Sequence, residues 1–227
     1  MKKITAYSEL VYIIGLMLTA IGNALVSHAN FGMSMVVAPS YILHLKISQW
    51  LPFYSFGMSG YVFQGLLVIL TAIIVKRFRL SYLFSFVTAV IFGIFLDLAL
   101  IPVSLIPAES LLVRIVLMAA GLAIVPAGVS LLFNTYISPE AYELLVKEIS
   151  RKFGFETGKT KLCYDISSLI LSVILSLTLF GTSGLVGIGI GTVISAFANG
   201  TLISAYLKFY RRLFDFRDLL PFRRHFE

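Results

Sequence analysis

The ionisable residues that could do chemistry in this sequence stand singly within long apolar runs. Asp97 lies toward the end of one such run, and Arg114 lies at the start of the next. An ionisable group inside a membrane span is costly, so it is by default a candidate for a functional role. Two interpretations follow: an Asp97–Arg114 ion pair that ties two helices together, or a relay that carries a proton or a substrate.

Asp165 opens another apolar run, shortly after the cations Lys159 and Lys161. It is interpreted either as part of a substrate path or as a residue of the membrane interface. Other polar side chains could line the same path, and these candidates are Asn30, Ser34, Gln64, Asn134, Ser138 and Asn199.

Two broken loops, Asn30–Ser34 and Asn134–Ser138, each precede a short helical segment. Ser34 and Ser138 are candidate N-caps for these segments. Exposed helix N-termini at the two serines would offer backbone N–H groups to an anionic moiety.

Other kinds of chemistry are not expected. His28 and His44 have no third ligand at a useful spacing, so no metal site is predicted. Gly189 and Gly191 resemble a phosphate loop, but no lysine follows at the required spacing. Cys163 is the single cysteine, which excludes an internal disulfide and a cysteine-based metal cluster. No catalytic triad can be assembled, so the sequence predicts neither an enzyme nor a cofactor.

The composition places these residues in a membrane protein. The chain has 227 residues, of which 59% are hydrophobic and 13% charged, against roughly a quarter charged in soluble domains. The net charge of +7 is interpreted as cationic cytoplasmic loops rather than as a nucleic-acid site.

Six apolar runs are long enough to cross a bilayer. They are Leu10–Val26, Ser59–Val75, Leu80–Val103, Leu111–Phe133, Leu162–Phe180 and Leu185–Leu207. A tight turn over 181–184 separates the last two runs, and the basic tail from Lys208 is expected to lie against lipid headgroups. With both termini in the cytoplasm, every Lys and Arg except Lys46 and Arg114 falls on the cytoplasmic side.

Two further segments are helical but do not span. Met35–Leu45 is apolar, too short to cross, and carries Pro39, so it is predicted to be re-entrant or interfacial. Residues 139–153 have one apolar face and end before Gly154, a suitable C-terminal stop. They are predicted to form an amphipathic helix at the membrane surface.

The two halves of the chain repeat this order of elements. Gly15 and Gly22 align with Gly121 and Gly128 at one sequence offset. Ser34 with Ser138, Gln64 with Asp165, and Thr88 with Thr192 follow when small gaps are allowed. Because each half crosses three times, the halves have opposite orientations, as in many secondary transporters. The prediction is an all-α polytopic membrane protein of one domain, with repeats over about 8–103 and 111–207 and a tail over 208–227.

The chain resembles the YitT/YczE-type bacterial membrane proteins. The residues that carry the resemblance are Gly15 and Gly22, Ala29–Ser34, Ser138–Glu140, Asp165 and Gly187–Gly200. Met35 stands where the first loop of that family usually has a proline. The resemblance implies a topology rather than a substrate, and it implies a multi-pass protein of the bacterial inner (plasma) membrane.

Two functions fit these observations. The first is a small-solute permease or secondary transporter, for which an anionic metabolite is one candidate substrate. The alternative is a non-transporting subunit or scaffold for a partner complex, because Ala20 and Ala24 form a small-residue face that could dock a helix. The same face could serve internal packing or a homodimer. The expected partners are the lipid bilayer and a small molecule, not nucleic acid.

Overall fold

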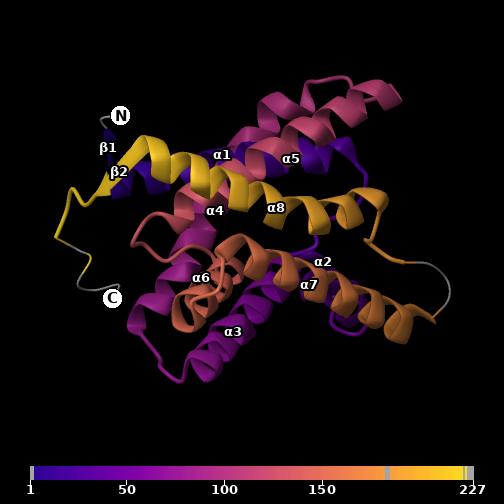
Figure 1. The fold of residues 1–227 in the computed structure, drawn as a ribbon. Helices are drawn as coiled ribbons and strands as arrows, with labels where there is room; N and C mark the ends of the chain where they lie inside the picture. The colour runs from indigo at the N-terminus through magenta and orange to yellow at the C-terminus, as the bar shows by residue number, and fades with distance from the viewer. Residues whose placement is uncertain (1–2, 182–184, 222, 224–227) are drawn as a thin grey trace.

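The protein is an all-α polytopic membrane protein, described by a computed structural model that covers residues 3–181, 185–221 and 223 (Figure 1). Six helices of this described part are long and apolar enough to cross a membrane. They are α1 (Ser8–Ala29), α3 (Phe56–Val75), α4 (Phe84–Ser104), which continues the 3-10 turn η1 (Leu80–Leu83), α5 (Leu111–Phe133), α7 (Thr157–Phe180) and α8 (Ile190–Leu213). Two shorter helices are α2 (Ala38–Ile47) and α6 (Ala141–Phe153).

The last span differs from the predicted run at both ends. Its helix begins at Ile190, because Gly187 adopts a φ of 74° and Gly189 is the extended N-cap residue. It continues into the predicted basic tail and ends at Leu213. The turn expected over 181–184 includes residues 182–184, which lie outside the described residues.

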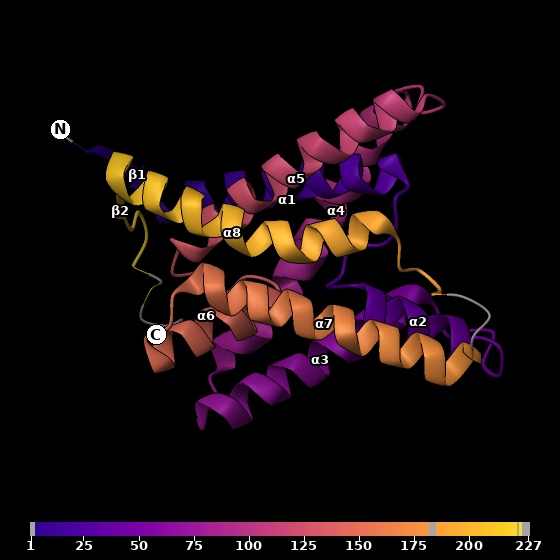
Figure 2. The same ribbon diagram turned by 45° about the vertical axis from the view of Figure 1, so that its right-hand side comes forward.

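The eight helices form two layers. One bundle contains α1, α4, α5 and α8, and the other contains α2, α3, α6 and α7, as the packed helix pairs and Figures 1 and 2 show. Equivalent helices of the two predicted repeats share a bundle: α1 with α5 and α4 with α8, then α2 with α6 and α3 with α7. Each bundle therefore takes half of its helices from each repeat.

The α1–α5 crossing is built on the four aligned glycines. A Cβ atom on Gly128 would lie 2.7 Å from the Gly15 carbonyl oxygen, and one on Gly121 would lie 2.8 Å from that of Gly22. Gly15 thus meets Gly128, while its repeat equivalent Gly121 meets Gly22, the repeat equivalent of Gly128. This is the reciprocal contact that a two-fold relation produces. Only glycines allow the two backbones to approach so closely.

The small-residue face of α1 is used within the chain. Ala20 and Ala24 are each 0% exposed, so they belong to the interior of the protein. The interpretation of this face as a docking site for a partner helix or a second copy is therefore wrong, and the internal-packing alternative is confirmed.

Both described ends of the chain meet on one face of the molecule, called here the terminal face (Figure 1). Strands β1 (Ile4–Tyr7) and β2 (Phe214–Arg217) pair in parallel. The Glu9 carboxylate accepts hydrogen bonds from the backbone N–H groups of Leu219 and Leu220. The tail immediately after α8 is thus held against the N-terminal segment, and its predicted location along the headgroups stays a prediction.

Helix α6 is inserted into the second bundle rather than resting on the surface. Its first six residues, Ala141–Val146, are all buried, and the helix packs against α3 and α7. The prediction of a surface helix was wrong because it treated the acidic residues as solvent-facing, whereas Glu143 has a buried cationic partner in Lys161. The predicted stop at Gly154 is confirmed by its φ of 68°.

The two repeats are not packed alike. Helices α7 and α8 meet closely, and a Cβ atom on Gly158 would lie 2.6 Å from the Gly200 carbonyl oxygen. The equivalent helices α3 and α4 approach each other near the η1 end, where a Cβ on Gly65 would lie 3.9 Å from Phe86. Farther along, a Cβ on Gly60 or Gly93 would have no neighbour within 4 Å. The pair thus diverges toward the face opposite the termini.

Candidate functional site: a charged cavity between the two bundles

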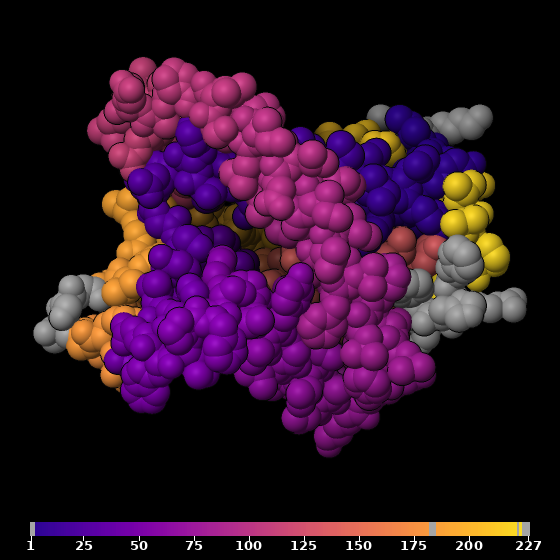
Figure 3. Space-filling model, turned by 180° about the vertical axis from the view of Figure 1, so that it is seen from behind, coloured from indigo at the N-terminus to yellow at the C-terminus, as the bar shows by residue number. Residues whose placement is uncertain are grey.

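A cavity of about 510 Å³ lies between the two bundles. Its walls come from α1, α4, α5 and α8 on one side and from α2, α3, α6 and α7 on the other. The space-filling view shows a hollow between the segment that holds α2 and α3 and the magenta helix α4 (Figure 3). The cavity is thus placed where α3 and α4 diverge, and its size is that of a small-molecule site.

One end of the cavity is charged. The Lys161 ammonium lies 3.3 Å from Glu143 Oε1 and 2.9 Å from Asp165 Oδ1. Lys161 is 2% exposed and Asp165 is 0% exposed. Charges buried this deeply need partners at contact distance, and the i,i+4 spacing of Lys161 and Asp165 on α7 supplies one of them.

Glu140 adds a further carboxylate to the cavity. It is the N-cap residue of α6 and lines the cavity. Within the described part of the chain, its carboxylate has neither a hydrogen bond nor an ion pair. Burial raises the pKa of Glu140 well above its ordinary value, the nearby Glu143 carboxylate raises it further, and Lys161 opposes both effects.

Polar side chains surround this charged end. The Tyr142 side chain lies close to Ser40 and Gln64, and burial is the main cause of its raised pKa. Gln64 Oε1 and Asn199 Oδ1 are buried and accept no hydrogen bond. Buried acceptors normally receive a hydrogen bond. These two oxygens therefore mark positions where a bound ligand or a water molecule could donate one.

The structure brings some of the predicted path residues together. Asn30, Ser34 and Asn199 line the cavity. Gln64 lies close to Tyr142, and Asp165 pairs with Lys161, so each of the two neighbours a residue of the cavity wall. The interpretation of Asp165 as an interfacial residue is wrong, because its side chain is fully buried and paired.

Asp97 and Arg114 do not form the predicted ion pair. Arg114 donates to the carbonyl oxygens of Ala29 and Asn30, at 2.8 and 2.6 Å, and lies over the Phe31 ring. The carbonyls at the end of α1 attract this cation, since a helix C-terminus carries partial negative charge. Asp97 is exposed and has no ion pair among the described residues. Neither residue lines the cavity.

Neither α2 nor α6 begins at the serine predicted to be its N-cap. The N-cap residue of α2 is Val37, and that of α6 is Glu140. Ser138 instead accepts a hydrogen bond at its carbonyl oxygen from Thr88 Oγ1, at 2.7 Å. The predicted N-caps at Ser34 and Ser138 are therefore wrong, and at the start of α6 the N-terminal position already holds the Glu140 carboxylate.

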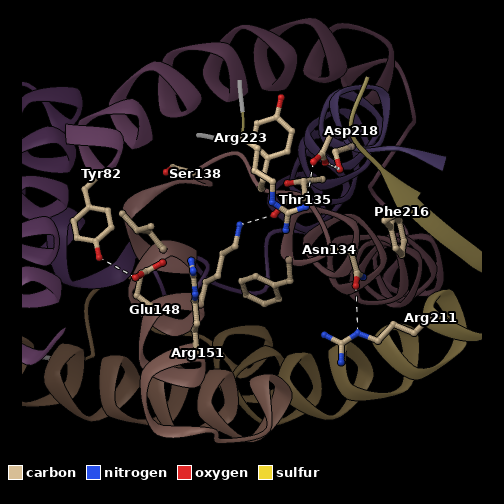
Figure 4. A pocket seen from close by; sticks show the side chains of 15 residues that line it. Tyr82, Asn134, Thr135, Ser138, Glu148, Arg151, Arg211, Phe216, Asp218 and Arg223 are labelled. Carbon is tan, nitrogen blue, oxygen red and sulfur yellow. Dashed lines mark hydrogen bonds and ion pairs between the residues drawn. The ribbon is translucent and has the colours of Figure 1, made fainter. Parts of the chain in front are cut away.

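Asn134 and Ser138 line a second pocket, of about 340 Å³, on the terminal face (Figure 4). Two of its cations are engaged with the chain after α5: Lys147 donates to two backbone carbonyls, and Arg211 donates to Asn134 Oδ1 at 3.3 Å. These bonds hold α6 and the end of α8 to the α5–α6 loop. The Tyr82 hydroxyl donates to Glu148 at 2.8 Å and joins η1 to α6.

Sequence reasoning missed Glu140, Glu143 and Lys161 as members of a site. The two glutamates were explained by the dipole of the helix that follows, and the lysine by the excess of positive charge on one side of the membrane. The available signal was the i,i+4 spacing of Lys161 and Asp165 at the start of an apolar run, which follows the helix that begins with Glu140 and Glu143.

Fold and site together define a polytopic α-helical membrane protein with an ionised cavity between two bundles. The chain belongs to a family of unknown function, DUF6198, whose sequence model matches residues 6–208. No curated protein and no solved structure matched it. The family match does not name the YitT/YczE-type proteins, so that resemblance stays a prediction.

Proposed function

We propose that the protein is a secondary transporter of a small solute and that the cavity between the bundles is its binding site. The observation that carries this proposal is the buried Glu143–Lys161–Asp165 cluster at the cavity, with the unpaired Glu140 beside it. Ionisable groups inside membrane proteins commonly mark substrate and proton pathways.

The unequal packing of the repeats supports a mechanism of alternating access. Inverted repeats can exchange conformations, so that the cavity opens to each side in turn. In the described state α7 and α8 close the cavity at Gly158 and Gly200, while α3 and α4 diverge. The alternative state would separate α7 from α8 and close α3 on α4.

The direction of opening follows from the charge distribution. If the terminal face is cytoplasmic, as the positive charges predict, the described state opens to the outside. The inner-membrane location implied by the YitT/YczE resemblance is part of this proposal. That resemblance also fits a transporter-like topology.

The experiment is solute retention by proteoliposomes. Purified protein is reconstituted, incubated with a mixed metabolite pool and separated from free solute, and the retained solutes are quantified by mass spectrometry. We expect the wild type to enrich at least one solute several-fold, and Glu140→Gln to lose most of that enrichment. Glu156→Gln is the matched control, because it removes an exposed carboxylate outside the cavity.

Two results would contradict the proposal. Wild-type liposomes that retain no more solute than protein-free liposomes would favour a non-transporting subunit. Transport that is unchanged in Glu140→Gln would place the transport path somewhere other than this cavity.

A further inference from the structure

Several donors of the cavity wall are used within the protein. Thr19 and Asn23 line the cavity, but their donors are used within α1: Thr19 Oγ1 donates to the Gly15 carbonyl and Asn23 Nδ2 to the Thr19 carbonyl, each at 2.8 Å. The Lys161 ammonium, the one cation among the described lining residues, is used by Glu143 and Asp165. These three donors are therefore already occupied by the protein.

Two groups of the cavity wall have acceptor oxygens that receive no hydrogen bond from the described residues. Asn199 is 7% exposed and lines the cavity, and its Oδ1 has no hydrogen-bond partner. The Glu140 carboxylate faces the same cavity without a hydrogen bond or an ion pair from any described residue. A ligand that satisfies these oxygens must donate hydrogen bonds.

The charge of the cavity favours the same kind of ligand. Three carboxylates, on Glu140, Glu143 and Asp165, stand against the single ammonium of Lys161. An anion would have to approach Glu140 at the start of α6, where that carboxylate already occupies the favourable position at the helix N-terminus. A cation beside Glu140 would instead stabilise the ionised form of that carboxylate, which burial and Glu143 otherwise disfavour.

The remaining wall suits an apolar body. Tyr41 and Phe56 pack edge to face with ring centroids 5.5 Å apart, and both line the cavity with Phe92 and Leu96. Aromatic rings favour organic cations and hydrocarbon groups alike.

We propose that the cavity binds an organic ammonium ion, whose N–H groups face the Glu140 carboxylate and Asn199 Oδ1 and whose apolar body contacts the aromatic wall. This inference rests on the proposed function for its biological meaning. It replaces the anionic solute suggested by the sequence, because that expectation depended on helix N-termini at Ser34 and Ser138 that the fold does not form.

The test compares ligands of matched shape. Binding of 2-phenylethylammonium, phenylacetate and 2-phenylethanol to the detergent-purified full chain is measured by isothermal titration calorimetry at pH 7. We expect the ammonium ion to bind at least tenfold more tightly than the carboxylate or the alcohol. Equal or tighter binding of phenylacetate, or no binding of the ammonium ion to the wild type, would overturn the inference.

Variants locate the site. Glu140→Gln and Asn199→Leu should each weaken ammonium binding at least tenfold, whereas Glu156→Gln should leave it unchanged. Asn199→Leu gives an independent answer if Glu140→Gln is not monodisperse on size exclusion. Unchanged binding in whichever of these two cavity variants folds would place the ligand outside this cavity and overturn the inference.

The outcome also separates this inference from the transporter proposal. Ammonium binding to a protein that retains no solute in liposomes would uphold the ligand class and contradict transport. Liposomes that enrich anions only would uphold transport and contradict the ligand class.

Discussion

Lys161 links the buried carboxylates at the residue scale. It is the cation that contacts both Glu143 and Asp165, and it comes from the first turns of α7. Burying an ion pair is not by itself strongly stabilising, but removing one partner leaves an uncompensated charge away from water. The cluster therefore makes the stability of the protein depend on one ammonium group.

We expect Lys161→Met to lower the free energy of unfolding by about 3–5 kcal/mol. The measurement is chemical denaturation in detergent, followed by tryptophan fluorescence or circular dichroism. Lys159→Met is the matched control, because it breaks only the exposed pair with Glu156 and should leave stability unchanged. A loss no greater than that of the control would mean that the carboxylates are protonated or hydrated without Lys161.

The raised pKa of Glu140 leads to a second prediction, which concerns the pH dependence of the stability of the protein. Because its folded-state pKa is raised above the ordinary value of 4.5, the folded protein holds this proton more tightly than the unfolded chain does. Its stabilising effect is complete below pH 4.5 and is lost as the pH rises through the folded-state pKa. Burial, Glu143 on α6 and Lys161 on α7 together determine how far the folded-state pKa of Glu140 lies above 4.5.

The thermal midpoint of Glu140→Gln minus that of the wild type should therefore increase with pH. It is measured by differential scanning fluorimetry in one detergent from pH 4.5 upward, with Glu156→Gln as the control. A difference that stays constant over the whole range would show that Glu140 does not titrate as its surroundings require.

At the scale of elements, glycine decides which helices pack and which separate. Gly15, Gly22, Gly121 and Gly128 join α1 to α5, whereas Gly93 on α4 has open space around it. The same residue type thus has opposite consequences, because only some positions meet another backbone.

We expect Gly128→Ala to destabilise the protein by about 1–3 kcal/mol, since the new Cβ would lie 2.7 Å from the Gly15 carbonyl and no rotamer change can relieve a backbone contact. Gly93→Ala should be neutral or stabilising by up to about 1 kcal/mol, because alanine favours a helix. Both are measured by thermal unfolding in detergent. Equal effects of the two substitutions would contradict the packing described for α1 and α5.

At the scale of the whole molecule, two bundles enclose a cavity, with α7 and α8 in close contact and α3 and α4 divergent. In the alternating-access mechanism that we propose, a small change at the α7–α8 contact should alter the balance between the two states. Gly158 is suited to this, because a Cβ there would lie 2.6 Å from the Gly200 carbonyl oxygen.

We expect Gly158→Ala to increase access to the cavity from the terminal face. Asn23, which lines the cavity, is replaced by cysteine in a Cys163→Ser background, and labelling by an impermeant maleimide is followed from each side. The parent should label from the face opposite the termini, and Gly158→Ala should raise the rate from the terminal face several-fold.

A cysteine at Glu156 reports which face is cytoplasmic, because this exposed position lies between α6 and α7. It should react in inverted vesicles and not in intact cells. Labelling of Asn23→Cys from one side only, at equal rates in both backgrounds, would contradict alternating access at this contact.

The sequence by itself determined the membrane class, the number of spans and the alignment of four glycines between the two halves. These properties depend on local composition: span length follows from apolar runs, and Gly15 and Gly22 can be aligned with Gly121 and Gly128 without coordinates. It also predicted Gly154 as the end of α6, because a helix end is set by the conformation of a single residue.

Only the tertiary structure decided which polar residues meet. Glu143 and Lys161 are explained separately by a helix dipole and by membrane charge bias, and nothing local shows that α6 is inserted beside α7. Arg114 likewise contacts carbonyls at the end of α1 rather than Asp97, because the arrangement of helices in space determines which partner a charge can reach. Burial and pairing are properties of that arrangement, so the site could not be read from the order of residues along the chain.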